Sequence, residues 1–314
     1  MKTVVTDSPL DAAAFIRSGG IVAFPTETVY GLGADVFNES AIEKIFIAKQ
    51  RPADNPLIVH IANLNEMELL TTEITTSARE FVERFFPGPL TVVLEKSERV
   101  PLSVTAGLET VAIRMPLNEM AHEFLAACKT PVAAPSANLS GRPSPTTWEA
   151  VLEDLDGRID CILRGDSTQI GLESTVVDCT RDEPVILRPG AISLEELRSV
   201  ISKTRKLTDA DQAQALPSPG LLHRHYSPAA TVVLINAVSL VPNAETSAYI
   251  GLSDRTETFQ FVKMCETADD YARELFEFFR DCDRRGIGIV YCEKVAGEGI
   301  GAALMDRLER AAEG

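Results

Sequence analysis

The sequence predicts an α/β protein: a mixed twisted sheet with flanking helices, followed by a smaller C-terminal Rossmann-like α/β domain. Three observations lead to this fold class. The chain has 314 residues, enough for two domains that each bury a core. Short β-branched runs alternate with segments of helical period. A polar segment that becomes rich in Pro and Gly interrupts this alternation at 199–229.

The first domain is predicted to cover residues 1–198. Its helices are expected at 40–49 and 75–86, where apolar residues recur at helical spacing. Its strands are expected in the β-branched runs at 21–24, 56–61, 90–94, 110–114, 131–135 and 174–178.

Residues 199–229 are predicted to form an interdomain linker, and residues 230–314 the second domain. The second domain should contain strands at 231–237, 247–252 and 286–292 and helices at 267–286 and 299–313. Strands that alternate with helices in this way predict a small parallel sheet. The run GEGIG at 297–301 does not complete a dinucleotide-binding fingerprint, so we interpret it as an ordinary glycine turn.

Composition excludes several classes of protein. The chain is 45% hydrophobic and 24% charged, and no apolar run approaches the roughly 18 residues of a membrane span. The N-terminus lacks a basic segment followed by an apolar core, so we expect a cytoplasmic protein with no membrane contact. Six scattered cysteines without a CxxC pair predict neither disulfides nor structural zinc. The net charge of −16 opposes a stable grip on nucleic acid, so any tRNA contact should be transient.

Two cations stand at a proline-braced corner. Lys49 and Arg51 close the helical pattern at 40–49 and flank the start of a turn at Pro52. A single cation there would be explained by the negative end of the helix dipole. Two of them, directly before a buried strand, also form a good phosphate clamp, because Arg presents a planar fork and Lys a point charge. Asn55 would add an amide at the same corner.

Two loops carry further polar side chains. The segment 24–36 follows a strand with hydroxyls, a carboxylate and glycines, which suit either a small-ligand site or a simple turn. Serine-rich loops such as 133–147 usually form turns and caps. This loop is long, braced by prolines and contains glycine, as an oxygen-rich nucleotide site would need. No P-loop or nucleophile-elbow motif is present, which weakens a hydrolase interpretation. His60 lies in an apolar run and would more often be a core histidine than a ligand.

Seven ordered motifs together resemble the threonylcarbamoyl-AMP synthase family. The resemblance spans most of residues 15–195, and SPGLLHRHYSP at 218–228 is similar to the linker of the two-domain form. The end of the chain, GIGAALMDRLERAA, also looks like the end of that family's second domain. The seven motifs are PTETVYGLG, AKQRPADNPL, FPGPLT, VAIRMP, PSANLSGRPSPT, GLESTVVD and ILRPGAI.

The resemblance implies a nucleotidyltransferase. The family makes L-threonylcarbamoyl-AMP from L-threonine, bicarbonate and ATP with Mg²⁺ and releases pyrophosphate. The product serves N6-threonylcarbamoyladenosine formation in tRNA through a downstream transferase. By position in the matching motifs, threonine contacts are expected from Thr28, His60, Arg114, the Ala134 backbone and Ser174. ATP contacts are expected in a concave nucleotide site from Lys49, Arg51, Asn55, Thr110, Ser136, Asn138, Ser144, Arg188 and Tyr226.

Two of these residues are expected to be catalytic. Lys49 and Arg51, together with Mg²⁺, would neutralise the triphosphate while the carboxylate of carboxy-threonine attacks the α-phosphorus. No metal ligand is assigned to the protein, since Mg²⁺ would bind mainly through the ATP phosphates. The linker is predicted to act as a lid, with Tyr226 on the nucleotide. The alternative is an exposed tether whose basic-aromatic end docks the second domain.

Two other functions compete with this one. The concave domain could instead belong to an RNA-binding protein, although the acidic charge opposes that class. A carbamoyl-transfer enzyme that acts on another acceptor would share the same intermediate and is harder to separate. Pyrophosphate release that depends on threonine and bicarbonate would distinguish the three.

Overall fold

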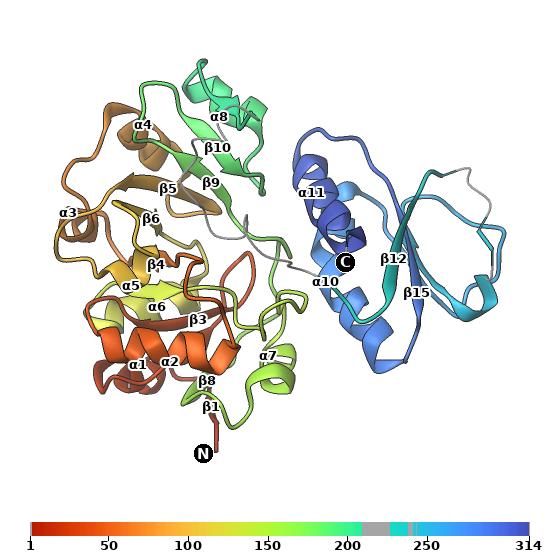
Figure 1. Cartoon of the computed structure of the whole chain (residues 1–314), viewed down its shortest axis with the longest axis horizontal. Helices are drawn as coiled ribbons and strands as arrows, with labels where there is room; N and C mark the ends of the chain where they lie inside the picture. Colours follow the sequence, from red (N-terminus) through yellow and green to blue (C-terminus); the bar gives the residue numbers. More distant parts are fainter. Residues whose placement is uncertain (1, 209–226, 238–240, 243, 314) are drawn as a thin grey trace.

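The computed structural model describes residues 2–208, 227–237, 241–242 and 244–313. Two bodies lie side by side, and each has its own sheet (Figure 1). The first sheet has 11 strands and the second has four. The predicted fold class, a mixed sheet followed by a smaller parallel α/β domain, is confirmed. Within the described residues, no helix is long and apolar enough to cross a membrane.

The large sheet mixes parallel and antiparallel neighbours. Its order is β1-β8-β2-β3-β7-β4-β6-β5-β9-β10-β11, with antiparallel pairs such as β2–β3 and parallel pairs such as β4–β6. Its strands are β1 (Val4–Thr6), β2 (Val22–Phe24), β3 (Gly31–Asp35), β4 (Ile58–His60), β5 (Leu90–Glu95), β6 (Thr110–Arg114), β7 (Val132–Ala134), β8 (Cys161–Leu163), β9 (Thr175–Asp178), β10 (Val185–Arg188) and β11 (Arg205–Lys206).

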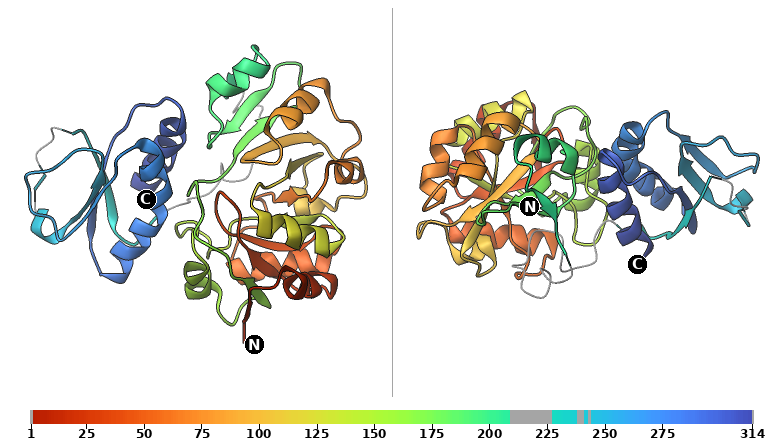
Figure 2. Two further views of the ribbon diagram at one scale, coloured as in Figure 1. Left: turned by 180° about the vertical axis from the view of Figure 1, so that it is seen from behind. Right: turned by 90° about the horizontal axis from the view of Figure 1, so that it is seen from above.

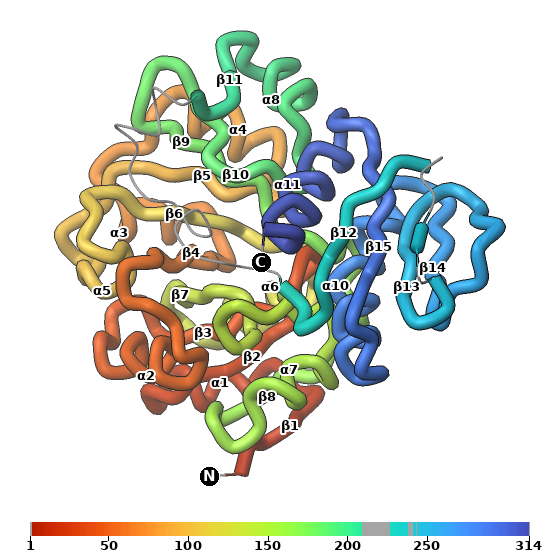
Figure 3. Tube along the Cα trace, turned by 45° about the vertical axis from the view of Figure 1, so that its right-hand side comes forward, coloured from red at the N-terminus to blue at the C-terminus, as the bar shows by residue number. Residues whose placement is uncertain are grey.

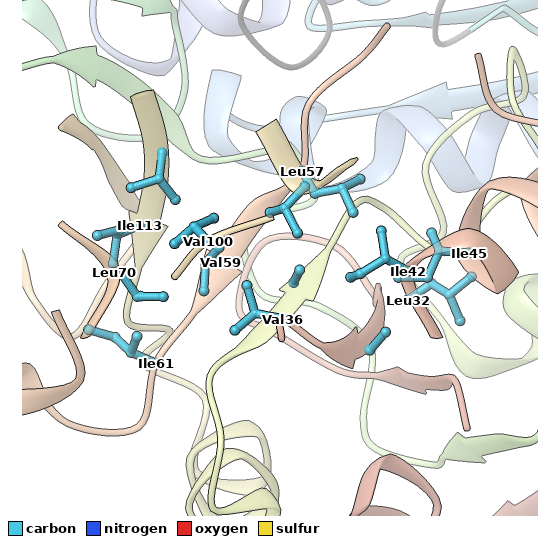
Figure 4. Packing of buried hydrophobic residues seen from close by; sticks show 14 of the residues in the cluster. Leu32, Val36, Ile42, Ile45, Leu57, Val59, Ile61, Leu70, Val100 and Ile113 are labelled. Atoms are coloured by element: carbon cyan, nitrogen blue, oxygen red, sulfur yellow. The ribbon is translucent and has the colours of Figure 1, made fainter. Parts of the chain in front are cut away.

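Helices flank this sheet (Figures 1 and 2), and the hydrophobic core lies between the helices and the sheet. The side chains of β3 and α2 interdigitate at one side of the core, where Leu32 meets Ile42 and Ile45 (Figure 4). The helices of this domain are α1 (Pro9–Arg17), α2 (Glu39–Lys49), the 3-10 turn η1 (Leu64–Glu66), α3 (Met67–Leu70), α4 (Thr76–Phe85), α5 (Leu102–Thr105), α6 (Glu119–Cys128), α7 (Trp148–Leu155) and α8 (Leu194–Val200).

The second domain is a four-stranded parallel sheet with two helices packed on one face. Its order is β12-β15-β13-β14. The helices α10 and α11 lie between this sheet and the first domain, as Figures 1 and 3 both show. The elements are β12 (Thr231–Ile235), η2 (Ala244–Thr246), β13 (Ala248–Gly251), β14 (Phe261–Met264), α10 (Ala268–Arg284), β15 (Ile289–Glu293) and α11 (Ile300–Ala312).

Several features differ from the sequence predictions. The segment 24–36, interpreted as a ligand loop or turn, contains strand β3 within the sheet. The predicted linker at 199–229 begins inside α8, and β11 extends the first domain's sheet by pairing with β10. Strands β1, β8, β10 and β14 were not predicted, and neither were helices α1, α6, α7 and α8. The two-residue β11 is too short for any periodicity to show, and glycines in β3 obscure its strand character.

Candidate functional site

A cleft of about 740 Å³ opens where many strand ends and loops of the first domain converge. Of its described lining residues, five are Lys or Arg and one, Glu173, is a carboxylate. A cationic cleft in a protein of net charge −16 attracts small anions rather than long polyanions. The lining residues are Thr26, Thr28, Val29, Gly31, Lys49, Arg51, Pro56, Ile58, His60, Arg114, Ala134, Pro135, Ser136, Asn138, Ser140, Arg142, Ser144, Glu173, Ser174 and Arg188.

Arg114 is the centre of a buried cluster at the end of β6. Its guanidinium donates to Glu27 Oε1 at 2.6 Å, to Thr28 Oγ1 at 2.7 Å and to the Gly88 carbonyl at 3.2 Å. Arg114 is 4% exposed and Glu27 is 3% exposed, so the pair is shielded from water. These contacts use three of the five guanidinium N–H groups and fix the fork, while the remaining two can receive a carboxylate. We call Glu27, Thr28, His60 and Arg114 the Arg114 cluster.

His60 completes this cluster as a neutral imidazole. Strand β4 places it beside Arg114 in the parallel register with β6. Burial, followed by the charge of Arg114, lowers the pKa of His60 to about 3. Its Nδ1 lies 3.2 Å from the Ile58 carbonyl, and Phe24 meets the ring edge-on. An uncharged imidazole in this position can hydrogen-bond a hydroxyl without adding to the local positive charge.

Lys49 supports the loop that follows β7. Its ammonium is buried and donates to the carbonyl oxygens of Ser136 and Asn138, each at 2.5 Å. Burial, followed by the charge of Arg51, lowers the pKa of Lys49 well below its ordinary value. Two of the three ammonium N–H groups are therefore committed to the loop. Lys49 positions the residues 136–144, which we call the Ser136–Ser144 loop.

Arg51 is placed by the end of α2. The helix ends at Lys49, and Gln50 turns the chain in a left-handed conformation (φ 52°). Arg51 then folds onto its own corner, with Nε 3.3 Å from the Asn55 carbonyl and Nη2 3.1 Å from the Pro56 carbonyl. Backbone carbonyls thus orient a guanidinium that lines the cleft. The proline-braced corner predicted from the sequence does present both cations to one cleft.

A third group of contacts joins Ser174, Arg188 and Glu173. Arg188 donates to the Ser174 carbonyl at 3.0 and 3.1 Å and to its Oγ at 3.1 Å. Ser144 donates to Glu173 Oε1 at 2.5 Å. Burial raises the pKa of Glu173, but the charges of Arg307 and Arg188 outweigh it and lower that pKa overall. Glu173 is therefore held as a carboxylate.

The structure brings together eleven of the fourteen residues predicted for the site. Asn55 and Thr110 are not among the lining residues: Asn55 is buried beside Arg51, and Thr110 is the half-buried first residue of β6. Tyr226 lies outside the described residues. The residues in the cleft are Thr28, Lys49, Arg51, His60, Arg114, Ala134, Ser136, Asn138, Ser144, Ser174 and Arg188.

Sequence reasoning missed Glu27 and Glu173, the carboxylates that pair with Arg114 and Arg307. Both lie in quoted motifs, PTETVYGLG and GLESTVVD, but a single carboxylate in a loop gives no sign of its partner. Their partners, Arg114 and Arg307, are separated from them by 87 and 134 residues. Only the fold brings these charges together.

The described donors do not fit a resident metal centre. No three His, Cys, Asp or Glu side chains of the described residues come close enough together to hold an ion. Glu173, the carboxylate in the cleft, is already bonded to Ser144 and Arg307. A divalent cation could reach this cleft as the companion of a polyphosphate ligand.

Comparisons with known proteins cover nearly the whole chain. A family model described as "Telomere recombination" matches residues 14–190, and another, "Threonylcarbamoyl-AMP synthase, C-terminal domain", matches residues 192–313. A threonylcarbamoyl-AMP synthase of Pyrococcus abyssi is 44% identical, with 96% of this chain and 92% of the relative covered. One of Bacillus subtilis is 41% identical with the same coverage. The crystal structure of P. abyssi Sua5 complexed with L-threonine is 42% identical, covers 99% of this chain and 97% of its own, and has a TM-score of 0.89.

Proposed function

Because the chain belongs to the threonylcarbamoyl-AMP synthase family, we propose that its cleft is where L-threonine, bicarbonate and ATP react. The enzyme makes L-threonylcarbamoyl-AMP, the adenylate used in N6-threonylcarbamoyladenosine formation in tRNA. The observation that carries the assignment of the cleft is its charge: five Lys and Arg side chains and one carboxylate line it. That combination suits two anionic substrates held side by side.

The Arg114 cluster is the proposed threonine site. The Arg114 fork, already fixed by Glu27 and Thr28, would receive the substrate carboxylate on its remaining N–H groups. Neutral His60 would hydrogen-bond the threonine hydroxyl or amine without repelling an ammonium group. Ser174 and the backbone of Ala134 also line this cleft. In support, the related P. abyssi Sua5 has been crystallised as a complex with L-threonine.

The nucleotide would lie against Lys49, Arg51 and the Ser136–Ser144 loop. Arg51 offers a fork to the triphosphate, and Lys49 offers its remaining N–H while it holds the loop in place. Ser136, Asn138 and Ser144 would supply hydroxyl and amide contacts to the nucleotide, and Arg188 a further charge. We also keep Asn55, Thr110 and Tyr226 as proposed ATP contacts, although the first two stand outside the lining of the cleft.

The chemistry requires positioning rather than a protein nucleophile. The threonine amine and bicarbonate condense to an N-carboxylate, forming a C–N bond and releasing water. An oxygen of the N-carboxylate then forms a bond to the α-phosphorus of ATP while the bond to pyrophosphate breaks. Two anions must approach, so the cations of the cleft lower the barrier by neutralising the charge of the triphosphate and of the departing pyrophosphate. Mg²⁺ would supply further charge neutralisation as the ion that accompanies ATP. A cytoplasmic tRNA threonylcarbamoyl transferase would consume the product.

The test is to identify the product by mass spectrometry. We expect threonylcarbamoyl-AMP and pyrophosphate after incubation with ATP, Mg²⁺, L-threonine and bicarbonate, and neither when threonine or bicarbonate is left out. A carbamoyl-transfer enzyme for another acceptor would instead release pyrophosphate without threonine. An RNA-binding protein would release none. Either outcome would refute the proposal.

A further inference from the structure

The second domain reaches the cleft through two buried arginines. Arg280 of α10 and Arg307 of α11 both have side chains that are 0% exposed. Each forms an ion pair with a carboxylate of the first domain: Arg280 with Asp154 at 2.9 Å and Arg307 with Glu173 at 2.9 Å. Figure 3 shows both helices facing the first domain. The buried cations therefore lie at the interface between the domains.

Arg307 fixes the segments that carry Ser174 and Arg188. Its Nε donates to Glu173 Oε2, and its Nη2 donates to the Pro189 carbonyl at 3.1 Å. Glu173 directly precedes Ser174, and Pro189 directly follows Arg188. One guanidinium of the second domain thus touches the chain beside two residues of the cleft.

Arg280 fixes the Ser136–Ser144 loop. It donates to the Pro143 carbonyl at 2.6 Å and to both oxygens of Asp154. Asp154 in turn accepts from the Leu139 amide at 3.2 Å and from Arg142 Nη1 at 2.5 Å. The loop is held near its middle through Asp154 and near its end through Pro143.

The two arginines converge on Ser144. Arg280 holds the carbonyl of the preceding Pro143, and Arg307 holds Glu173, which accepts the Ser144 hydroxyl. Ser144 is 1% exposed and lines the cleft. We infer that Arg280 and Arg307 are positioning residues for the nucleotide, so that docking of the second domain completes the nucleotide-binding part of the cleft.

The hydrogen bonds of Arg280 and Arg307 indicate that they position the nucleotide site and do more than hold the two domains together. Adhesion is already provided by apolar contacts, because Val29 and Leu172 of the first domain pack into the core of the second. A further interdomain ion pair, Arg284 with Glu153, is 37% and 34% exposed and lies outside the buried set. Of these three arginines, only Arg280 and Arg307 bond to residues that line the cleft or directly adjoin a lining residue. Their acceptors are the Pro143 and Pro189 carbonyls and the Glu173 carboxylate.

The test measures ATP and threonine affinities separately in the full chain by calorimetry, with Mg²⁺ present. Arg307→Met should weaken ATP binding by about 10- to 100-fold, since a displaced loop misplaces several contacts together. Threonine affinity should fall less than ATP affinity, because the Arg114 cluster keeps its partners and, of the proposed threonine contacts, only Ser174 lies beside a residue that Arg307 holds. Arg280→Met should act in the same direction. Arg273→Met is the matched control: it removes an arginine of α10 whose partners, Asp270 and Glu274, lie on the same helix.

A double-mutant cycle tests whether Arg307 acts through Glu173. If it does, Arg307→Met with Glu173→Gln should weaken ATP binding no more than the stronger of the two single changes. Thermal unfolding of each variant shows whether the fold is kept, and Arg307→Lys, which retains the charge, should recover part of the affinity. Equal losses of ATP and threonine affinity, or additive effects in the cycle, would overturn the inference.

The inference rests on the proposed function, which identifies the nucleotide as ATP. The proposed function and the positioning role of the two arginines can nevertheless fail separately. If the unchanged protein binds ATP and makes no threonylcarbamoyl-AMP, the proposed function fails and the positioning role can still be measured. If it makes the product and Arg307→Met and Arg280→Met bind ATP as tightly as before, the positioning role fails alone.

Discussion

The Arg114 cluster and the Ser136–Ser144 loop are held in different ways. The contacts described above for Arg114 all come from the first domain, through Glu27, Thr28 and Gly88. The loop depends on Lys49 from its own domain and, through Asp154 and Pro143, on Arg280 from the other. The difference suggests that amino-acid recognition is built into one domain, whereas the nucleotide geometry depends on the docking of two.

The largest effect is expected from Arg114→Gln. The change leaves Glu27 buried without its cation, which should lower the free energy of unfolding by about 3–5 kcal/mol. It also removes the fork proposed for the threonine carboxylate, so threonine affinity should fall much more than ATP affinity. Chemical denaturation and calorimetric titration with each substrate measure the two effects.

A double variant separates stability from recognition. Arg114→Gln with Glu27→Gln removes the isolated charge and should recover much of the lost stability, but it should not recover threonine binding. Recovery of threonine affinity in the double variant would show that Arg114 acts only by neutralising Glu27.

Arg51→Ala tests the nucleotide side of the comparison. Loss of a charge-assisted fork at the triphosphate should reduce kcat/KM by about 30- to 1000-fold, or about 2–4 kcal/mol. Lys44→Ala is the control, since Lys44 lies on α2 and donates to the Gly19 carbonyl. Steady-state pyrophosphate release measures both, and a near-normal rate for Arg51→Ala would exclude the clamp.

Because His60 is buried and neutral in the Arg114 cluster, the free energy of unfolding should depend on pH. Its pKa is about 3 in the folded protein and about 6.5 in the unfolded chain. Below pH 6.5 the unfolded chain therefore binds a proton that the folded protein does not. The stability contributed by neutral His60 is complete above about pH 6.5 and decreases as pH falls, by about 2 kcal/mol at pH 5.

The variant His60→Gln should flatten this part of the stability curve. His122→Gln, at an exposed position of α6, is the control. Urea denaturation at a series of pH values from about 7 to about 4.5 measures the slope. The same slope in His60→Gln as in the unchanged protein would contradict the assignment of this proton uptake to His60.

The smallest effect is expected from Ser136→Ala. The Ser136 hydroxyl donates to Asn138 Oδ1 at 2.5 Å within the loop. Its loss should cost about 1 kcal/mol, or about fivefold in ATP affinity, because Lys49 still holds both backbone carbonyls. Titration with ATP measures this change, and threonine affinity should not follow it.

The sequence was informative where the signal is local. The helix ending at Lys49 and the proline-braced corner were predicted, because the helical period and the cations are adjacent in the chain. Strand β3 was missed, since its glycines look like loop residues. A Cβ on Gly33 would lie 2.5 Å from Val132, so packing against β7, which is distant in sequence, explains a glycine in that strand.

The supporting residues of the site were not predictable in the same way. Asp154, Arg280 and Arg307 occur in amphipathic helices, where a charged side chain is normally interpreted as solvent-exposed. Arg280 and Asp154 are 126 residues apart, and only domain docking brings them together. The role of Lys49 also became clear only from the structure, because the carbonyls it supports belong to a loop about 90 residues later.

Amide hydrogen exchange of the full chain tests the central comparison most directly. L-Threonine alone should slow exchange at 26–29, β4 and β6 and leave α10 and α11 unchanged. ATP with Mg²⁺ should slow exchange in the Ser136–Ser144 loop and also in α10 and α11, because a bound nucleotide would stabilise the contacts that Arg280 and Arg307 make. Protection by ATP that is confined to the first domain, or protection of α10 and α11 by threonine to the same extent, would contradict the account.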